Sequence, residues 1–201
     1  YALDAFTTGY YNSAVGASAG SAITTGIYNT LLGRAAGASI TTGNYITAIG
    51  GSTLNYLTVA TDSTVIGYDA GEYATGSYNT FVGSKAGQGG TTSAPYSSGQ
   101  YNTGLGKGAL AGFTTGNYNV AVGYLAGDSI TTSGNNTLVG AQAGSGITVG
   151  SENTFIGYIA GTNVTIGDYN VAVGTQALTT EDVGRAATAI GYQALYSQNS
   201  D

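Results

Sequence analysis

The sequence predicts an all-β fold, a parallel β-solenoid (β-roll) of about eleven coils of 17 residues each. The first observation is a glycine that recurs at positions 16, 33, 50, 67, 83, 106, 123, 140, 157, 174 and 191, so that most spacings are 17 residues, one is 16 and one is 23. The second is that Val, Leu or Ile precedes every one of these glycines. The third is the density of Gly, Thr and Asn, which disfavours helices throughout. Stacked repeats of this kind bury a core that one repeat cannot bury alone.

Each coil is expected to contain two short strands and two turns. Because side chains alternate between the faces of a strand, we predict that the aliphatic residue and the Thr, Ser or Val two positions earlier point into the core. A second apolar column is predicted to mark the second strand: Ile23, Ile40, Leu57, Phe113, Ile130, Ile147 and Val164. The glycine columns that begin at Gly9 and Gly16 are predicted to form the turns. Asn recurs at 12, 29, 79, 102, 119, 136, 153 and 170, which predicts a ladder of amides along the rod.

Composition excludes several classes of function. The net charge is −6, and only four basic residues are spread over 201 residues, which argues against binding to nucleic acid or to an anionic membrane. No apolar run approaches the roughly 20 residues that cross a bilayer, so no membrane insertion is expected. The chain has no His and no Cys, which removes the commonest zinc ligands and nucleophile–base pairs. We therefore expect no metal site, no cofactor and no enzymatic activity.

Paired carboxylates are the one catalytic arrangement that the composition leaves open, because two carboxyl groups suffice to cleave glycosidic bonds. The candidate pairs are Asp69 with Glu72 and Glu181 with Asp182. They lie at unrelated positions of the repeat, so a polysaccharide depolymerase is the weaker alternative.

A further apolar column points to self-association. It lies immediately before the aliphatic residue, next to side chains that are predicted to face inward, so alternation places it on the outside. An apolar stripe along the exterior of a monomer would promote aggregation unless a partner covers it. We therefore predict a homo-oligomer, with a trimer favoured, whose interface is this column; the alternative is a bulged strand with both columns inside. The column comprises Ala14, Leu31, Ala48, Val65, Phe81, Gly104, Ala121, Leu138, Phe155, Ala172 and Ala189.

Three segments carry a resemblance to known families: YNTFVGSKAG at 78–87, YNVAVGYLAG at 118–127 and ATAIGYQALYS at 187–197. They resemble the repeat region of bacteriophage tail fibres and are similar to the β-roll head of trimeric autotransporter adhesins. The resemblance implies a trimer of β-rolls in an extracellular fibre, on a virion or a cell surface, that supports attachment to a host. It also implies that the chain is a piece of a longer fibre protein, in keeping with a sequence that starts at Tyr1 and contains no Met.

A column of threonines suggests a different function. Thr24, Thr41, Thr58, Thr114, Thr131, Thr148 and Thr165 recur once per coil and are expected to face outward. A flat, regular Thr array resembles the surface of β-solenoid ice-binding proteins. Such proteins usually need two exposed Thr ranks, and the second Thr column here, at Thr30 and Thr47, is predicted to face inward. Ice binding is therefore an alternative to the fibre.

The whole chain, residues 1–201, is predicted to be one repeat array with an inserted loop at about 88–99. Loops inserted into a solenoid often carry recognition. Tyr96 in this loop is the candidate contact residue for a host cell-surface glycan or protein.

Overall fold

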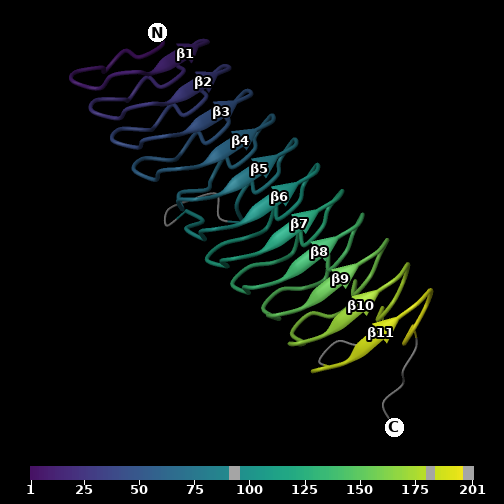
Figure 1. The fold of residues 1–201 in the computed structure, drawn as a ribbon. Helices are drawn as coiled ribbons and strands as arrows, with labels where there is room; N and C mark the ends of the chain where they lie inside the picture. Colours follow the sequence, from purple (N-terminus) through teal and green to yellow (C-terminus); the bar gives the residue numbers. More distant parts are fainter. Residues whose placement is uncertain (91–95, 180–183, 197–201) are drawn as a thin grey trace.

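The computed structural model describes residues 1–90, 96–179 and 184–196, and it shows a rod of stacked coils (Figure 1). Each coil contributes one three-residue strand, and the strands form a single parallel sheet in sequence order, β1 to β11. The prediction of an all-β parallel solenoid is confirmed. The strands are β1 Ser13–Val15, β2 Thr30–Leu32, β3 Thr47–Ile49, β4 Thr64–Ile66, β5 Thr80–Val82, β6 Thr103–Leu105, β7 Val120–Val122, β8 Thr137–Val139, β9 Thr154–Ile156, β10 Val171–Val173 and β11 Thr188–Ile190.

The strands keep one register although two repeats differ in length. Thr64 pairs with Thr80, and Thr80 pairs with Thr103, so equivalent residues stay aligned across both irregular spacings. The 16-residue repeat is one residue shorter than the others between Ala74 and Gly76. After the insertion, the backbone N–H groups of Ser98 and Gly99 donate to the Thr114 carbonyl, which is the bonding pattern of the regular coils. Both irregularities therefore lie between strands and leave the register of the sheet unchanged.

Among the described residues, the predicted second strand does not form in any coil, although one isolated parallel bridge joins Ala74 and Ser97. Ile23, Ile40 and their equivalents lie between a turn and a bend of the coil, and their side chains are fully buried as expected. The turn segments still bond from coil to coil, as when Gly37 N–H donates to the Thr53 carbonyl at 2.8 Å. They bend because each coil places residues at positive φ, among them Tyr28 at 57° and Ala35 at 57°. A backbone that passes through positive φ in every coil still satisfies its hydrogen-bonding groups, but it does not form an extended strand.

The orientation of the strands is the reverse of the predicted one. The middle residue of each strand faces the interior: Leu31 is 1% exposed, whereas its neighbour Leu32 is 45% exposed. The column that was predicted to form an oligomer interface is instead the core of the chain itself. This correction applies to Ala14, Leu31, Ala48, Val65, Phe81, Ala121, Leu138, Phe155, Ala172 and Ala189, of which Ala14 is half-buried and the others are buried. The aliphatic column from Val15 to Ile190 and the Thr30 column face outward.

The reason for this orientation is a match of side-chain volumes inside each coil. Six residues after the inward strand residue, the chain turns back over it at positive φ, at a position that holds either Gly or Leu. Leu occurs there only where the strand residue is Ala or Gly, as with Leu54 opposite Ala48. Where the strand residue is large the turn has Gly, and a Cβ on Gly87 would collide with the Phe81 ring. Such complementarity is typical of a close-packed interior.

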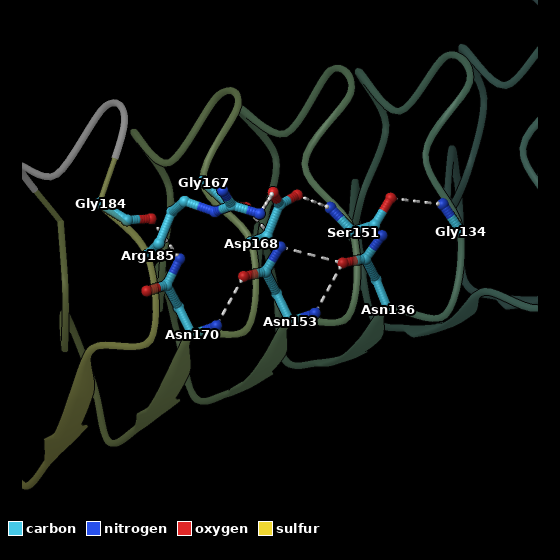
Figure 2. A network of polar contacts seen from close by, with 9 residues as sticks. All are labelled: Gly134, Asn136, Ser151, Asn153, Gly167, Asp168, Asn170, Gly184 and Arg185. Atoms are coloured by element: carbon cyan, nitrogen blue, oxygen red, sulfur yellow. Dashed lines mark hydrogen bonds and ion pairs between the residues drawn. The ribbon is translucent and has the colours of Figure 1, made fainter.

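The Asn column forms the predicted amide ladder in the interior (Figure 2). The Asn136 Oδ1 accepts hydrogen bonds from Asn153, from the backbone N–H at 3.0 Å and from Nδ2 at 3.1 Å. Asn153 Nδ2 also donates to the Gly167 carbonyl at 2.8 Å. Each amide thus joins its own coil to the next, and the ladder is interrupted where Ile46 and Ser63 take the place of Asn.

Exchanging the volumes of Ala48 and Leu54 tests the orientation of the strands. Ala48→Leu alone overpacks the coil and should lower the free energy of unfolding by about 2 kcal/mol. Adding Leu54→Gly recreates the Leu31–Gly37 arrangement of the preceding coil, so at least half of the loss should be recovered. Urea denaturation of the two single variants and the double variant gives the coupling energy. Independent, additive losses would contradict an inward Ala48.

Asn136→Ala tests the amide ladder. It removes the acceptor for two N–H groups of Asn153 and the donor to the Gly150 carbonyl, at a buried site. The free energy of unfolding should fall by about 2 kcal/mol or more. Asn117→Ala is the matched control, because the Asn117 amide bonds the backbone at an exposed position, where water replaces it. An equal fall in the free energy of unfolding in the two variants would contradict a larger stabilising contribution from the buried amide ladder.

Candidate functional site

The outer face of the sheet is the candidate interaction surface, defined here as two parallel ranks of side chains. One is a threonine rank: Ser13, Thr30, Thr47, Thr64, Thr80, Thr103, Val120, Thr137, Thr154, Val171 and Thr188. The other is an aliphatic rank: Val15, Leu32, Ile49, Ile66, Val82, Leu105, Val122, Val139, Ile156, Val173 and Ile190. No charged residue occurs in either rank. The face therefore offers methyl groups at every strand and a hydroxyl at every strand except β7 and β10, where Val120 and Val171 take the place of Thr.

The aliphatic rank is at least partly exposed along the whole rod. Val15 and Ile190, at its two ends, are 63% and 70% exposed, and Leu32, Val82 and Ile156 are also exposed. The strands pair in register, so each of these side chains lies beside its equivalents at the spacing of adjacent strands, about 4.8 Å. The rank is therefore a continuous apolar ridge.

Exposed aromatic and charged residues follow this face on both sides along the coil. Two positions before the threonine rank lies a tyrosine column whose rings stack, with centroids 4.7 Å apart for Tyr78 and Tyr101. Two positions after the aliphatic rank lie Arg34, Lys107 and several tyrosines, with the Lys107 ammonium 6.0 Å from the centroid of the Tyr124 ring. Charge thus occurs at the border of the face and not within it.

The predicted outward Thr ladder is only half-exposed at most of its positions, and its hydroxyls are engaged with the backbone. The Thr24 hydroxyl donates to the Thr41 carbonyl at 3.2 Å, and the Thr131 hydroxyl donates to the Thr148 carbonyl at 2.9 Å. The same bond recurs from Thr41, Thr114 and Thr148 to the next coil. The backbone carbonyls of Thr58 and Thr165 accept two of these hydrogen bonds. This ladder therefore holds neighbouring coils together through side-chain hydrogen bonds. The threonines that do face outward from the sheet are those of the Thr30 column, which were predicted from the sequence to face inward.

The inserted loop folds back against the rod at its C-terminal end. Tyr96 is half-buried and packs its ring 5.0 Å from that of Tyr56 and 6.1 Å from that of Tyr73. Burial, together with the neighbouring Glu72 carboxylate, raises the pKa of Tyr73. Tyr96 thus anchors the loop, and residues 91–95 of the predicted 88–99 loop lie outside the described residues.

Of the candidate carboxylate pairs, Asp69 and Glu72 lie in the same turn, where the Glu72 N–H donates to the Asp69 carbonyl at 3.4 Å. Glu72 accepts a hydrogen bond from Gln88 Nε2 at 3.0 Å, and Asp168 pairs with Arg185 at 3.0 Å (Figure 2). Glu181 and Asp182 lie outside the described residues. Within the described ranges, no pocket opens in the surface and no three acidic side chains come together as metal ligands would.

Comparison with protein-family models, with curated proteins and with solved structures finds no match for this chain. Among the described residues no helix is long and apolar enough to span a membrane.

Among the carboxylates of the described residues, Asp128 is the one whose environment predicts a pH dependence. Its Oδ1 is buried without a hydrogen-bond partner, and burial raises the pKa of the carboxyl above its ordinary value of 3.8. Because the folded chain favours the protonated form, the contribution of Asp128 to stability is lost as the pH rises from 3.8 through the raised pKa.

Asp128→Ser tests this, because Ser occupies the same position of the repeat at Ser21 and Ser145. At neutral pH the variant should have the higher free energy of unfolding. The advantage should shrink towards about pH 3, where Asp128 is protonated in the folded and the unfolded chain. Thermal unfolding of both proteins across this range measures the difference, and a difference that does not change with pH would contradict the assignment.

Proposed function

We propose that this chain is a shaft segment of an extracellular fibre, in which copies of the chain associate through the outer face of the sheet and support attachment to a host surface. The observation that carries the proposal is the uncharged, aliphatic and threonine-lined face that runs the length of the rod.

The constancy of the aliphatic rank is the first reason. One-sided sheets usually alternate between apolar residues inside and polar residues outside. Here all eleven outward positions before the glycine are Val, Leu or Ile, in a chain whose inward positions are often smaller. Exposed apolar patches that extend over several hundred Å² mark interaction surfaces in soluble proteins.

A second copy of the chain is the partner that this surface fits best. Eleven strands at about 4.8 Å give a strip about 50 Å long, and two ranks are about 12 Å wide, so one copy offers on the order of 600 Å². That area reaches the lower end of stable interfaces, about 1,200 Å² over two partners. A neighbouring copy also has the same rung spacing, so its ridge can interdigitate along the full length. The absence of charge from the two ranks removes any repulsion between identical faces.

The wider role follows from the resemblance of the repeats to those of phage tail fibres and trimeric adhesins. Such a fibre is a trimer outside the cell, and the segment does no chemistry itself. Contact with a host glycan or protein belongs in this proposal to the inserted loop around Tyr96, where the repeat is interrupted.

Val139→Lys tests the assembly. It places a charge in the aliphatic rank of β8, where burial of an unpaired ammonium is costly, so the oligomer should dissociate to monomers. Thr132→Lys is the matched control, because Thr132 is exposed in the preceding turn and outside the face. Sedimentation of the parent and of both variants at the same concentration gives their masses. A monomeric parent protein, or an oligomer that tolerates Val139→Lys, would contradict the proposal.

The outward orientation of the threonine rank favours a second candidate, ice binding. Thr30, Thr47 and Thr64 stand side by side on a sheet with a regular repeat, next to an apolar rank. Thermal hysteresis by a monomeric parent protein, lost in Thr137→Lys, would favour this candidate over the fibre. A stable oligomer without thermal hysteresis would favour the fibre.

A further inference from the structure

A ladder of three exposed tyrosines runs along one edge of the coils, formed by Tyr78, Tyr101 and Tyr118. The rings of Tyr78 and Tyr101 stack with centroids 4.7 Å apart and planes 4° from parallel. The rings of Tyr101 and Tyr118 stack at 5.0 Å and 3°. All three side chains are exposed to solvent, by 44% to 57%. Such an array is open to small reagents over its full length.

The backbone holds this ladder in place. Each of the three residues lies at positive φ, between 57° and 62°, which fixes the direction in which the side chain leaves the coil. The Tyr118 N–H donates to the Gln100 carbonyl at 3.1 Å, so neighbouring coils are tied together at the base of the rings. The stack is therefore set by the spacing of the coils and does not depend on ring–ring attraction alone.

The composition of the chain makes tyrosine the side chain that an oxidant is expected to attack. The chain has 17 Tyr but no Cys, Met, Trp or His, so it lacks the side chains that usually react first with oxidants. A phenol that loses one electron and one proton becomes a phenoxyl radical, whose unpaired spin is shared with the ring carbons ortho to the oxygen. In this chain such radicals form on tyrosine, and in the ladder a second phenol lies in contact.

We propose that Tyr78, Tyr101 and Tyr118 form a site of oxidative cross-linking, at which a haem-peroxidase-type oxidant that consumes hydrogen peroxide joins neighbouring rings through a carbon–carbon bond. This inference concerns a covalent modification and is independent of the assembly proposed above.

The reaction balances as follows. Two phenols each give up one electron and one proton, and hydrogen peroxide takes up the two electrons and two protons and yields two molecules of water. The two radicals form a bond between their ortho carbons, and each of these carbons then transfers its hydrogen to its phenoxyl oxygen, which restores both aromatic rings. The product is a biphenol with two hydrogen atoms fewer than the starting pair.

Parallel rings must tilt before their ortho carbons can touch. Exposed side chains reorient within nanoseconds, which is fast enough for neighbouring radicals to meet. The coils cannot separate, because the strands on either side are paired, Thr80 with Thr103 and Thr103 with Val120. A cross-link therefore joins coils that are already adjacent.

The positions of the basic residues make the cross-link easy to map. After denaturation, trypsin cuts at Lys85, Lys107 and Arg185, so Tyr101 lies in peptide 86–107 and Tyr118 in peptide 108–185. Treatment of the folded protein with a peroxidase and hydrogen peroxide should join these two peptides, with a mass lower by two hydrogen atoms and with biphenol fluorescence. Mixing ¹⁴N- and ¹⁵N-labelled protein before oxidation distinguishes links within one chain from links between copies.

Tyr101→Phe is the test variant, because it keeps the stacked ring but removes the phenol from both pairs. The joined 86–107 and 108–185 peptides should disappear, while any link from Tyr96 to Tyr56 or Tyr73, which joins peptide 86–107 to peptide 35–85, persists. Tyr124→Phe is the control, since Tyr124 is exposed but stacks on no other ring in the described part of the chain, and its joined peptides should persist. The proposal is overturned if the link forms only between differently labelled copies, if it survives in Tyr101→Phe, or if oxidation leaves the two peptides separate.

Discussion

In-register stacking of coils is the constraint on which the rest of this structure depends. Backbone hydrogen bonds hold successive coils together, so almost every side chain lies about 4.8 Å from the equivalent side chain above and below. Only residues that tolerate their own kind can fill such columns: amides bond amides, tyrosine rings stack and aliphatic side chains pack. A column of like charges would repel itself, which explains why only 7% of the residues are charged and why they scatter among the columns.

Much of the architecture could be predicted from the repeat, but the orientation of the strand could not be taken from the constancy of the aliphatic column. The sequence contained two better indications. Asn12 and Ala14 are two residues apart, so a buried amide ladder requires the strand residue after it to face inward as well. Leu54, Leu110 and Leu178 occur only in coils whose inward strand residue is Ala or Gly. This pattern indicates that the strand residue and the residue six positions later fill the same space in the core.

Other features depend on tertiary context that a single sequence does not carry. Thr24 and Thr30 are chemically alike and each recurs once per coil, yet one hydroxyl bonds the next coil and the other residue lies on the open face of the sheet. The positive φ of Tyr28 and Tyr101 is unusual for an aromatic residue and has no local sequence signature. The packing of the Tyr96 ring against Tyr56 depends on where the inserted loop ends, which the spacing of the repeats alone does not define.

The way in which the segments between strands absorb the short and the long repeat has a consequence for how such a molecule can change its size. Thr64, Thr80 and Thr103 remain aligned across both irregular repeats. The pairing of each strand therefore does not depend on the exact length of the segment that connects it to the next strand. Loss or duplication of whole coils would leave every column continuous and alter only the reach of the rod, in steps of about 4.8 Å. The number of copies of the 17-residue repeat in the gene would thus set the length of the rod, while the side chains exposed along it would stay the same.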